Sequence, residues 1–306
     1  MKKIVLFGSD TFLGKAIIKV AEGSNQKIIP IPTNNAKRID MIALILGEIR
    51  PDIAINTVQA RGGILYMKKY PGEIFYQNAS FGIEFMEQLR LYNVPKVVNI
   101  LSNCCYPDNI TIPFEEEDFW KGLPESNVMA QAMSLRNLAV QAVSYRRQYG
   151  MQTANLVITA IYGEGDAFDE ENAQVIPAMI TKFCRAVRNK ENTVTLWGTG
   201  NATREFLYVE DAAKGVIEAS MQYDGEEVLN IASGIEITIR ELANIIAEIC
   251  DYRGQIIWNT SMPEGIQRKC LSNKKIKSLF NFTPSISLEE GITRTVQWYK
   301  KNIEDV

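Results

Sequence analysis

Histidine is absent from the 306 residues of this sequence. It is the usual general base of serine and cysteine hydrolases and the commonest protein ligand of zinc and of non-haem iron. Its absence largely excludes these classes of enzyme. The five cysteines are odd in number, and none of them stands in a Cys-x-x-Cys pair. We therefore expect no disulfide framework and no metal site, and a reducing, cytoplasmic compartment suits such a chain.

Long apolar runs and clusters of basic residues are also missing. No apolar stretch approaches the roughly 18 residues that cross a membrane, and the run at residues 4–7 is too short for a signal peptide. The 33 Lys and Arg against 36 Asp and Glu give a formal net charge of −3. Because nucleic-acid binding needs clustered positive charge, the sequence predicts a protein that partners neither membranes nor nucleic acids.

Apolar runs alternate with helix-like spacing through the first half of the chain, which predicts an α/β fold with a doubly wound parallel sheet. After about residue 163 the pattern breaks into separated pieces. We expect a dinucleotide-binding domain at residues 1–163 and a smaller α/β substrate domain at 164–306, with the chain crossing back at about 204–220. The expected strands are 3–8, 27–32, 53–57, 97–101, 151–159 and 194–197, and the expected helices are 13–21, 41–49, 73–92, 127–149, 175–189, 209–223, 238–251 and 288–303.

A turn with glycine at both ends joins the first expected strand to the first expected helix. This order is typical of a Rossmann-type dinucleotide site, where a helix N-terminus holds the pyrophosphate. Thr11 replaces the middle glycine of that motif, and its Cβ can hinder the approach of the phosphates. An NAD or NADP site and a tight turn without a ligand are both compatible with this pattern. The candidate cofactor residues are Gly8, Thr11, Phe12, Leu13, Gly14 and Asp40.

The end of the second expected strand does not indicate which cofactor would bind. Its residues 30–34 include neither an acid for a ribose 2′-hydroxyl nor an arginine for a 2′-phosphate. The choice between NAD and NADP therefore stays open.

Several motifs follow one another in the order and at the spacing of one known family. They are Arg61-Gly62-Gly63-Ile64, Ser102-Asn103-Cys104-Cys105-Tyr106-Pro107, Gln174-Val175-Ile176-Pro177, Trp197-Gly198-Thr199-Gly200, Arg204-Glu205-Phe206 and Arg268-Lys269. With these motifs the sequence resembles the GDP-L-fucose synthase branch of the extended short-chain dehydrogenases/reductases over almost its whole length.

The resemblance implies a substrate and a mechanism. Members of the family epimerise C3 and C5 of GDP-4-keto-6-deoxymannose and then reduce C4 with NADPH. By this resemblance Ser102 would hold the 4-keto oxygen and Cys104 would act in epimerisation. A homodimer through the helices at 73–92 and 127–149 is implied as well. The positions that resemble those holding the guanine and the pyrophosphate are Val175, Lys182, Trp197, Arg204 and Arg268.

Three catalytic positions depart from the family's pattern. Its Tyr-x-x-x-Lys pair falls on Gln131 and Leu135, and its histidine falls on Gln174. A two-residue shift of the register would offer Met129 and Met133 instead, and no Tyr-x-x-x-Lys occurs anywhere in the sequence. Losing a general acid costs about 10²- to 10⁴-fold in rate. The sequence therefore predicts that ordinary C4 reduction is lost.

Whether the protein is an enzyme is left open by these departures. One hypothesis is altered chemistry, or epimerisation alone, on a nucleotide-linked keto sugar with Cys104 as the base. A second is a non-catalytic nucleotide-sugar-binding subunit that partners an active homologue. A third is an NAD(P)-dependent enzyme with a substitute acid. In epimerisation, Asp166, Asp169 and Glu170 are the candidates for returning the proton that Gln174 cannot supply. A buried core position without a catalytic role is the alternative for Cys104.

Overall fold

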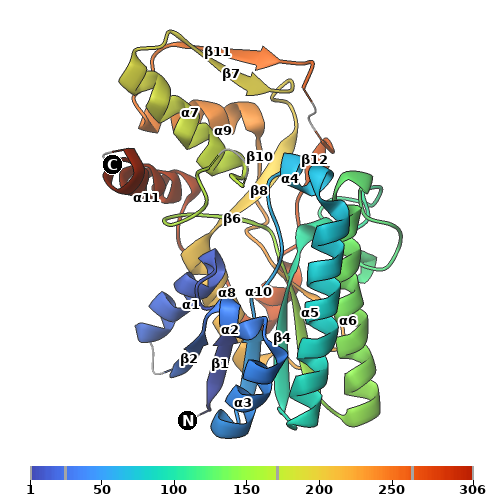
Figure 1. The fold of residues 1–306 in the computed structure, drawn as a ribbon. Coiled ribbons are helices and arrows are strands. Elements are labelled where there is room, and N and C mark those ends of the chain that lie inside the picture. Colours follow the sequence, from blue (N-terminus) through green and yellow to red (C-terminus); the bar gives the residue numbers. More distant parts are fainter. Residues whose placement is uncertain (1, 24–25, 170–171, 263–264, 305–306) are drawn as a thin grey trace.

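A computed structural model describes residues 2–23, 26–169, 172–262 and 265–304. A six-stranded parallel sheet lies in the lower half of Figure 1, and a smaller α/β unit lies above its carboxyl edge. The strand order is β2-β1-β3-β4-β5-β9, and every neighbouring pair is parallel. These strands are β1 (Ile4–Phe7), β2 (Ile28–Ile31), β3 (Ile53–Asn56), β4 (Lys96–Ser102), β5 (Gln152–Ile158) and β9 (Leu229–Ile231).

Helices cover both faces of this sheet, as the continuous apolar strands require. In β1, Val5 and Phe7 belong to one buried cluster, while Ile4 and Leu6 belong to the other. The first cluster includes residues of α3 (Ile39–Ile49), α5 (Pro71–Leu91) and α6 (Met129–Tyr149), and the second includes residues of α1 (Phe12–Glu22) and α8 (Val209–Gln222). The expected doubly wound Rossmann-type fold is confirmed.

The strand order reverses direction at β1. The chain leaves β1 for β2 on one side and later returns to β3 on the other, so β1 and β3 flank a topological switch point. In open parallel sheets ligands bind at the carboxyl ends of the strands beside such a point. Gly8 follows β1 and Thr57 follows β3, so the glycine turn lies at this place.

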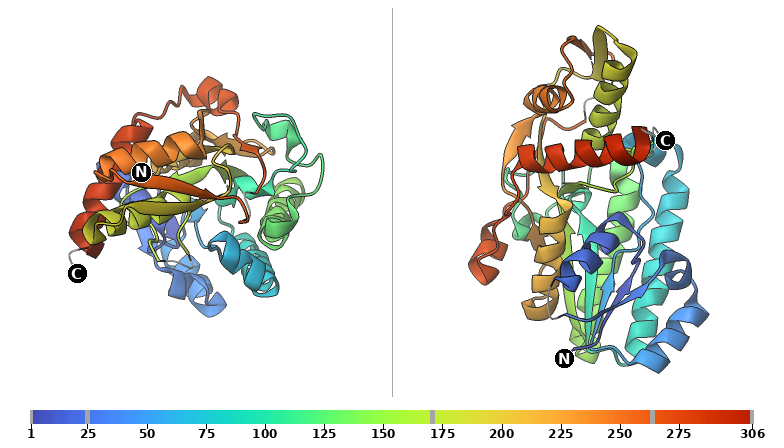
Figure 2. Two further views of the ribbon diagram at one scale, coloured as in Figure 1. Left: turned by 90° about the horizontal axis from the view of Figure 1, so that it is seen from above. Right: turned by 90° about the vertical axis from the view of Figure 1, so that its left-hand side faces the viewer.

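The second unit has its own core. A four-stranded sheet contains β10 (Glu236–Thr238), β8 (Thr203–Tyr208) and β12 (Arg268–Lys269), with β6 (Ala160–Tyr162) also paired to β8. β7 (Thr193–Trp197) pairs with β11 (Gln255–Asn259). A third apolar cluster joins α7 (Val175–Asn189), α9 (Ile239–Ile249) and α11 (Leu288–Tyr299), which lie above the main sheet in Figure 1 and in the right-hand view of Figure 2.

The chain returns to the first unit later than the sequence pattern indicates. β8 remains in the second unit, whereas α8, β9 and α10 (Lys274–Phe280) pack with the six-stranded sheet. The expected crossing at about 204–220 includes most of α8, and β9 and α10 follow it along the chain. The division at residue 163 stays a prediction. Short α4 (Ile64–Lys69), α2 (Thr33–Ala36) and the strands β9 to β12 were not expected from the sequence.

Within the described ranges, no helix combines the length and the apolar character needed to span a membrane.

Candidate functional site

The turn after β1 requires glycine at both ends. Gly8 has a φ of +84°, and a Cβ on it would lie 2.5 Å from the Thr57 hydroxyl oxygen. A Cβ on Gly14 would lie 2.1 Å from the Gly8 carbonyl oxygen. Such distances are far inside van der Waals contact, so the turn brings the start of α1 tightly against the end of β1.

Thr11 caps α1 with its side chain turned toward the protein. Its hydroxyl donates to the Gly8 carbonyl oxygen at 2.8 Å, accepts from the Gly14 amide at 3.0 Å, and lies 2.9 Å from the Thr57 hydroxyl oxygen. Within the described residues, the backbone N–H groups of Phe12 and Leu13 have no hydrogen-bond acceptor. Two N–H groups at a helix N-terminus therefore remain for a phosphate, so the turn fits a dinucleotide pyrophosphate despite the replaced glycine.

Gly14→Ala is expected to lower the free energy of unfolding by about 3 kcal/mol, because the methyl group overlaps the Gly8 carbonyl and the turn must open. Urea unfolding followed by circular dichroism measures this loss. Gly23→Ala, at the other end of α1, is the control, since a Cβ there has 3.6 Å to its nearest neighbour, the Val20 carbonyl oxygen. Equal midpoints for the two variants would contradict the described close approach.

Two acids lie near the expected adenosine side of the turn. Asp10 accepts hydrogen bonds from the Thr33 amide at 2.7 Å and from the Thr33 hydroxyl at 2.6 Å, at the carboxyl end of β2. Asp40 instead accepts hydrogen bonds from Nε and Nη2 of Arg38 at the exposed start of α3. Its place as a cofactor residue stays a prediction.

A cavity of about 150 Å³ opens between the two units, above the carboxyl edge of the main sheet. It joins Asn103, which follows β4, to residues of the second unit. Among these residues are Gln174, Val175, Arg204, Phe206 and Lys269. The structure thus brings Val175 and Arg204 together, as the resemblance implies.

Cys104 lies beside this cavity in a setting that favours its thiolate. It is 6% exposed, and its amide donates to the Ser102 hydroxyl oxygen at 3.4 Å. A hydrogen bond from the Cys105 thiol lowers the pKa of Cys104 to about 7, with help from the positive charge of Lys269 and against the effect of burial. Burial raises the pKa of Cys105 and lowers that of Lys269. Cys104 is therefore buried, but its thiol loses its proton more readily than an ordinary core thiol does.

The side chains at the three positions that differ from the family's pattern cannot act as acids in the structure either. Gln131 and Leu135 lie on α6 with 6% and 3% of their surface exposed, and Leu135 belongs to the main core. Gln174 precedes α7, and its amide donates to the Gly62 carbonyl oxygen at 3.1 Å. None of these side chains has a proton to deliver near neutral pH.

The remaining residues expected to contact the substrate lie outside the lining described above. The Lys182 ammonium lies 5.9 Å from the centroid of the Trp197 ring, and it donates to the Thr195 carbonyl oxygen at 3.1 Å. Arg268 has an exposed guanidinium that pairs with Glu236, and its place as a substrate residue stays a prediction. Successive side chains of a strand point to opposite faces, so its neighbour Lys269 lines the cavity instead.

Of the candidate substitute acids, Asp166 has the most unusual setting. It is 8% exposed, and burial raises its pKa to about 6, while the charge of Arg61 opposes that shift. Its Oδ1 accepts from the Ala167 amide, whereas Oδ2 has no hydrogen-bond donor within the described part of the chain. Asp169 is exposed and accepts from the Asn172 amide. Glu170 lies outside the described residues.

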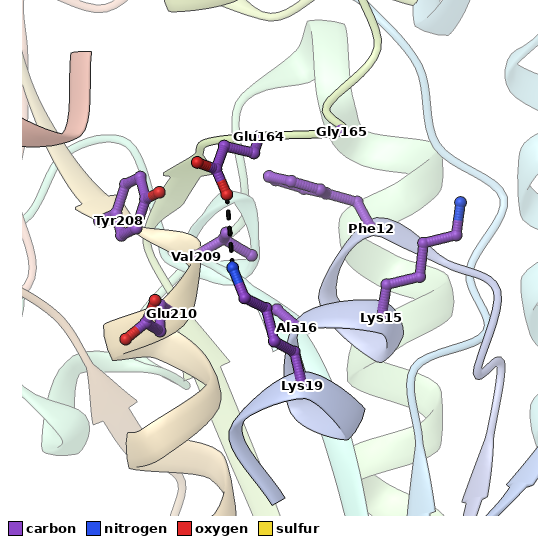
Figure 3. A pocket seen from close by; sticks show the side chains of 9 residues that line it. All are labelled: Phe12, Lys15, Ala16, Lys19, Glu164, Gly165, Tyr208, Val209 and Glu210. Atoms are coloured by element: carbon purple, nitrogen blue, oxygen red, sulfur yellow. Dashed lines mark hydrogen bonds and ion pairs between the residues drawn. The ribbon is translucent and has the colours of Figure 1, made fainter. Parts of the chain in front are cut away.

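A second, smaller cavity of about 100 Å³ lies between α1, the segment after β6 and the start of α8 (Figure 3). The Lys19 ammonium and a Glu164 carboxylate oxygen, 3.5 Å apart, form an ion pair across it, and the Phe12 ring points toward Gly165. These side chains already satisfy one another's charge, so we assign no ligand here.

Comparison with known proteins matches the model of the NAD dependent epimerase/dehydratase family to residues 4–232. The chain belongs to this family. GDP-L-fucose synthase from Sinorhizobium fredii is 30% identical over 307 residues, covering 99% of this chain and 97% of the relative. GDP-L-colitose synthase from Yersinia pseudotuberculosis is 28% identical over 305 residues, covering 97% of each chain. The resemblance to the GDP-L-fucose synthase branch of the extended short-chain dehydrogenases/reductases is confirmed.

A solved structure has the same fold. A GDP-L-fucose synthetase from Naegleria fowleri bound to NADP superposes with a TM-score of 0.89 at 24% sequence identity, covering 99% of this chain and 95% of the other. That structure is described as bound to NADP.

Proposed function

We propose that this protein binds a GDP-linked 4-keto-6-deoxyhexose in the cavity between its units and exchanges the protons beside the keto group, with Cys104 as the base. The observation that carries this proposal is the placement of Cys104 beside the Ser102 hydroxyl at the end of β4, where the Cys105 thiol and the charge of Lys269 lower the pKa of the Cys104 thiol to about 7. A base needs a pKa near the working pH, and Cys104 meets that condition. C4 reduction is not part of the proposal, because Gln131 and Leu135 occupy the positions of the acid and its lysine.

The chemistry uses residues at the end of β4. A keto group acidifies the hydrogens on the adjacent carbons, and the Cys104 thiolate takes one of these protons onto its sulfur. The electron pair left on carbon moves to the keto oxygen, and the Ser102 hydroxyl donates a hydrogen bond to that oxyanion. The proton then returns to the same carbon. Delivery from the opposite face inverts the centre, and Gln174 cannot make that delivery.

The same cavity suits a nucleoside diphosphate. Arg204 and Lys269 line it, and a guanidinium and an ammonium are the groups that bind phosphate oxygens best. Lys182 lies farther along α7, seven residues or about 10 Å from Val175 by helix rise, and its ammonium lies 5.9 Å from the centroid of the Trp197 ring at the end of β7. We assign the diphosphate to the first pair and the guanine to the second.

A dinucleotide fits the glycine turn through the amides of Phe12 and Leu13. NAD or NADP, when bound, would supply a hydride acceptor or donor for the sugar. The proposed proton exchange does not use that chemistry. The turn therefore gives the protein a second binding site that can be tested separately from the thiol.

Helices α5 and α6 supply the proposed dimer interface. They pack side by side and expose large apolar side chains, among them Phe75, Tyr76, Ile83 and Val140. Apolar surface gathered on two adjacent helices is typical of a four-helix interface between two copies. We propose a homodimer through this face, or a hetero-oligomer with an active homologue, in the cytoplasm.

The deciding experiment is proton NMR of GDP-4-keto-6-deoxymannose in D₂O with the protein. Loss of the C3 or C5 proton signal supports Cys104 as a base, and new signals from an inverted centre add epimerisation. The absence of exchange with the sugar nucleotide still bound would refute the proposed chemistry. It would favour the second candidate, a non-catalytic binding subunit.

The exchange rate is expected to rise with pH through a midpoint near 7, because the thiolate is the reacting form. Cys105→Ala removes the thiol that contributes most to lowering the pKa of Cys104, so its midpoint is expected about one pH unit higher. Rates measured from about pH 5.5 to 8.5 test this. A midpoint that is the same in both proteins would exclude Cys105 as the donor.

A further inference from the structure

An acidic side chain lies where the adenosine end of a dinucleotide is bound in folds of this kind. The amides of Gly8 and Ser9 donate to the Ile31 carbonyl oxygen at 2.9 and 3.0 Å, which ties the glycine turn to the end of β2. Asp10, the next residue of the turn, reaches across to Thr33 and accepts both of its donors on Oδ1. A carboxylate therefore stands at the carboxyl end of β2, although β2 itself ends without one.

Asp10 carries its negative charge at neutral pH. Partial burial acts to raise its pKa, but the two hydrogen bonds from Thr33 outweigh that effect and hold the pKa below its ordinary value. The cation that follows β2, Arg38, is bonded to Asp40 by its Nε at 3.2 Å and by its Nη2 at 2.5 Å. Lys37 is exposed on the surface, and Lys15, exposed on α1, is close enough for its charge to add to the lowering of the pKa of Asp10. The fixed charge at the strand end is thus that of Asp10.

Position and charge together decide what can bind. With the pyrophosphate at the N-terminus of the first helix, the adenosine ribose lies over the end of the second strand. An acid there accepts a hydrogen bond from the ribose 2′-hydroxyl of NAD, whereas NADP carries a dianionic phosphate at the same oxygen. A carboxylate next to that phosphate repels it, and specificity often rests on such a repulsive element.

We propose that Asp10 makes the dinucleotide site of this protein selective for NAD(H) over NADP(H). The inference rests on the proposed dinucleotide site at the glycine turn, and it sets this chain apart from the Naegleria fowleri relative, whose structure is described as bound to NADP. The selecting residue lies in the turn after β1, not at the end of β2, where acids usually fulfil this role.

Isothermal titration of the purified protein with NADH and with NADPH tests the proposal without any turnover. NADH is expected to bind about 10- to 100-fold more tightly. Asp10→Asn keeps an oxygen acceptor for Thr33 but loses the charge, so the ratio should fall toward one. Asp10→Arg should reverse it. Glu48→Gln, which removes one negative charge from an exposed position on α3, is the matched control and should leave the ratio unchanged.

Each result has a clear meaning. NADPH binding as tightly as NADH to the unmodified protein would overturn the assignment, and so would a preference that Asp10→Asn leaves intact. Binding of neither dinucleotide would overturn it too. Proton exchange on the sugar nucleotide needs no dinucleotide, so exchange measured in the same preparation separates a failure at Asp10 from a failure of the proposed function.

Discussion

Cys104→Ser is expected to reduce proton exchange beside the keto group by about 10²- to 10⁴-fold. Serine nearly matches the size of cysteine, but its hydroxyl does not ionise near neutral pH, so the base is lost while the packing is kept. The hydrogen bond from the Cys105 thiol and the charge of Lys269, which lower the pKa of Cys104, then have no thiolate to stabilise. Proton NMR of the sugar nucleotide in D₂O gives the rate directly.

A matched cysteine variant separates the loss of the base from a general effect of substitution. Cys184→Ala changes an equally buried cysteine on α7, in the apolar core of the second unit and away from the cavity. Its exchange rate should stay close to that of the unmodified protein. Titration with GDP should give the same affinity for both variants. Exchange at the full rate by Cys104→Ser would remove Cys104 from the mechanism and leave the thiol as a core residue.

The parallel sheet was predictable because each of its first strands reads as a short apolar run. Ile4–Phe7 and Ile53–Asn56 are buried throughout, which is the pattern that helices on both faces impose. Strands β9, β10 and β12 are two or three residues long. Such short strands carry no periodic signal of their own, since their pairing depends on neighbours far away in the sequence. The return of β9 and α10 to the main sheet has no sequence signal for the same reason.

The site was predictable only in part. The motifs predict a site that includes Ser102, Cys104, Val175 and Arg204, and these residues lie toward the carboxyl edge of the main sheet. The motifs could not decide between Arg268 and Lys269, because that choice depends on which face of a two-residue strand meets the cavity. The environment of Asp10 was also beyond a sequence pattern, since its partner Thr33 approaches it only after β1 and β2 pair.

The surroundings of Leu135 do not suit the lysine of a Tyr-x-x-x-Lys pair. Leu135 is 3% exposed and packs in the core that α6 shares with the main sheet. A lysine there would place an ammonium among apolar side chains, which costs several kcal/mol unless a partner is supplied. Because the side chains around Leu135 are apolar, introducing Tyr-x-x-x-Lys also requires a partner for the lysine, and therefore more than two substitutions.

Arg136, the next residue of α6, is expected to be essential for the stability of the segment that follows Cys104. Its guanidinium is buried and donates to the carbonyl oxygens of Cys105 at 2.8 Å, Gly122 at 2.7 Å and Phe119 at 2.6 Å. Arg136→Met keeps the apolar stem but leaves three acceptors without a donor. We expect a loss of at least about 3 kcal/mol in the free energy of unfolding.

Urea unfolding of Arg136→Met measures that loss, and Arg147→Met on the same helix is its control. Arg147 is exposed and pairs with Glu226 at the surface, so its removal should leave the unfolding midpoint unchanged. Because Arg136 holds the Cys105 carbonyl, the folded fraction of Arg136→Met should also show slower proton exchange than the control. A midpoint equal to that of Arg147→Met would mean that water replaces the guanidinium at all three carbonyls. The packing of Phe119 against Tyr106 and the hydrogen bond from the Tyr106 hydroxyl to Asn230 would then help to hold the segment.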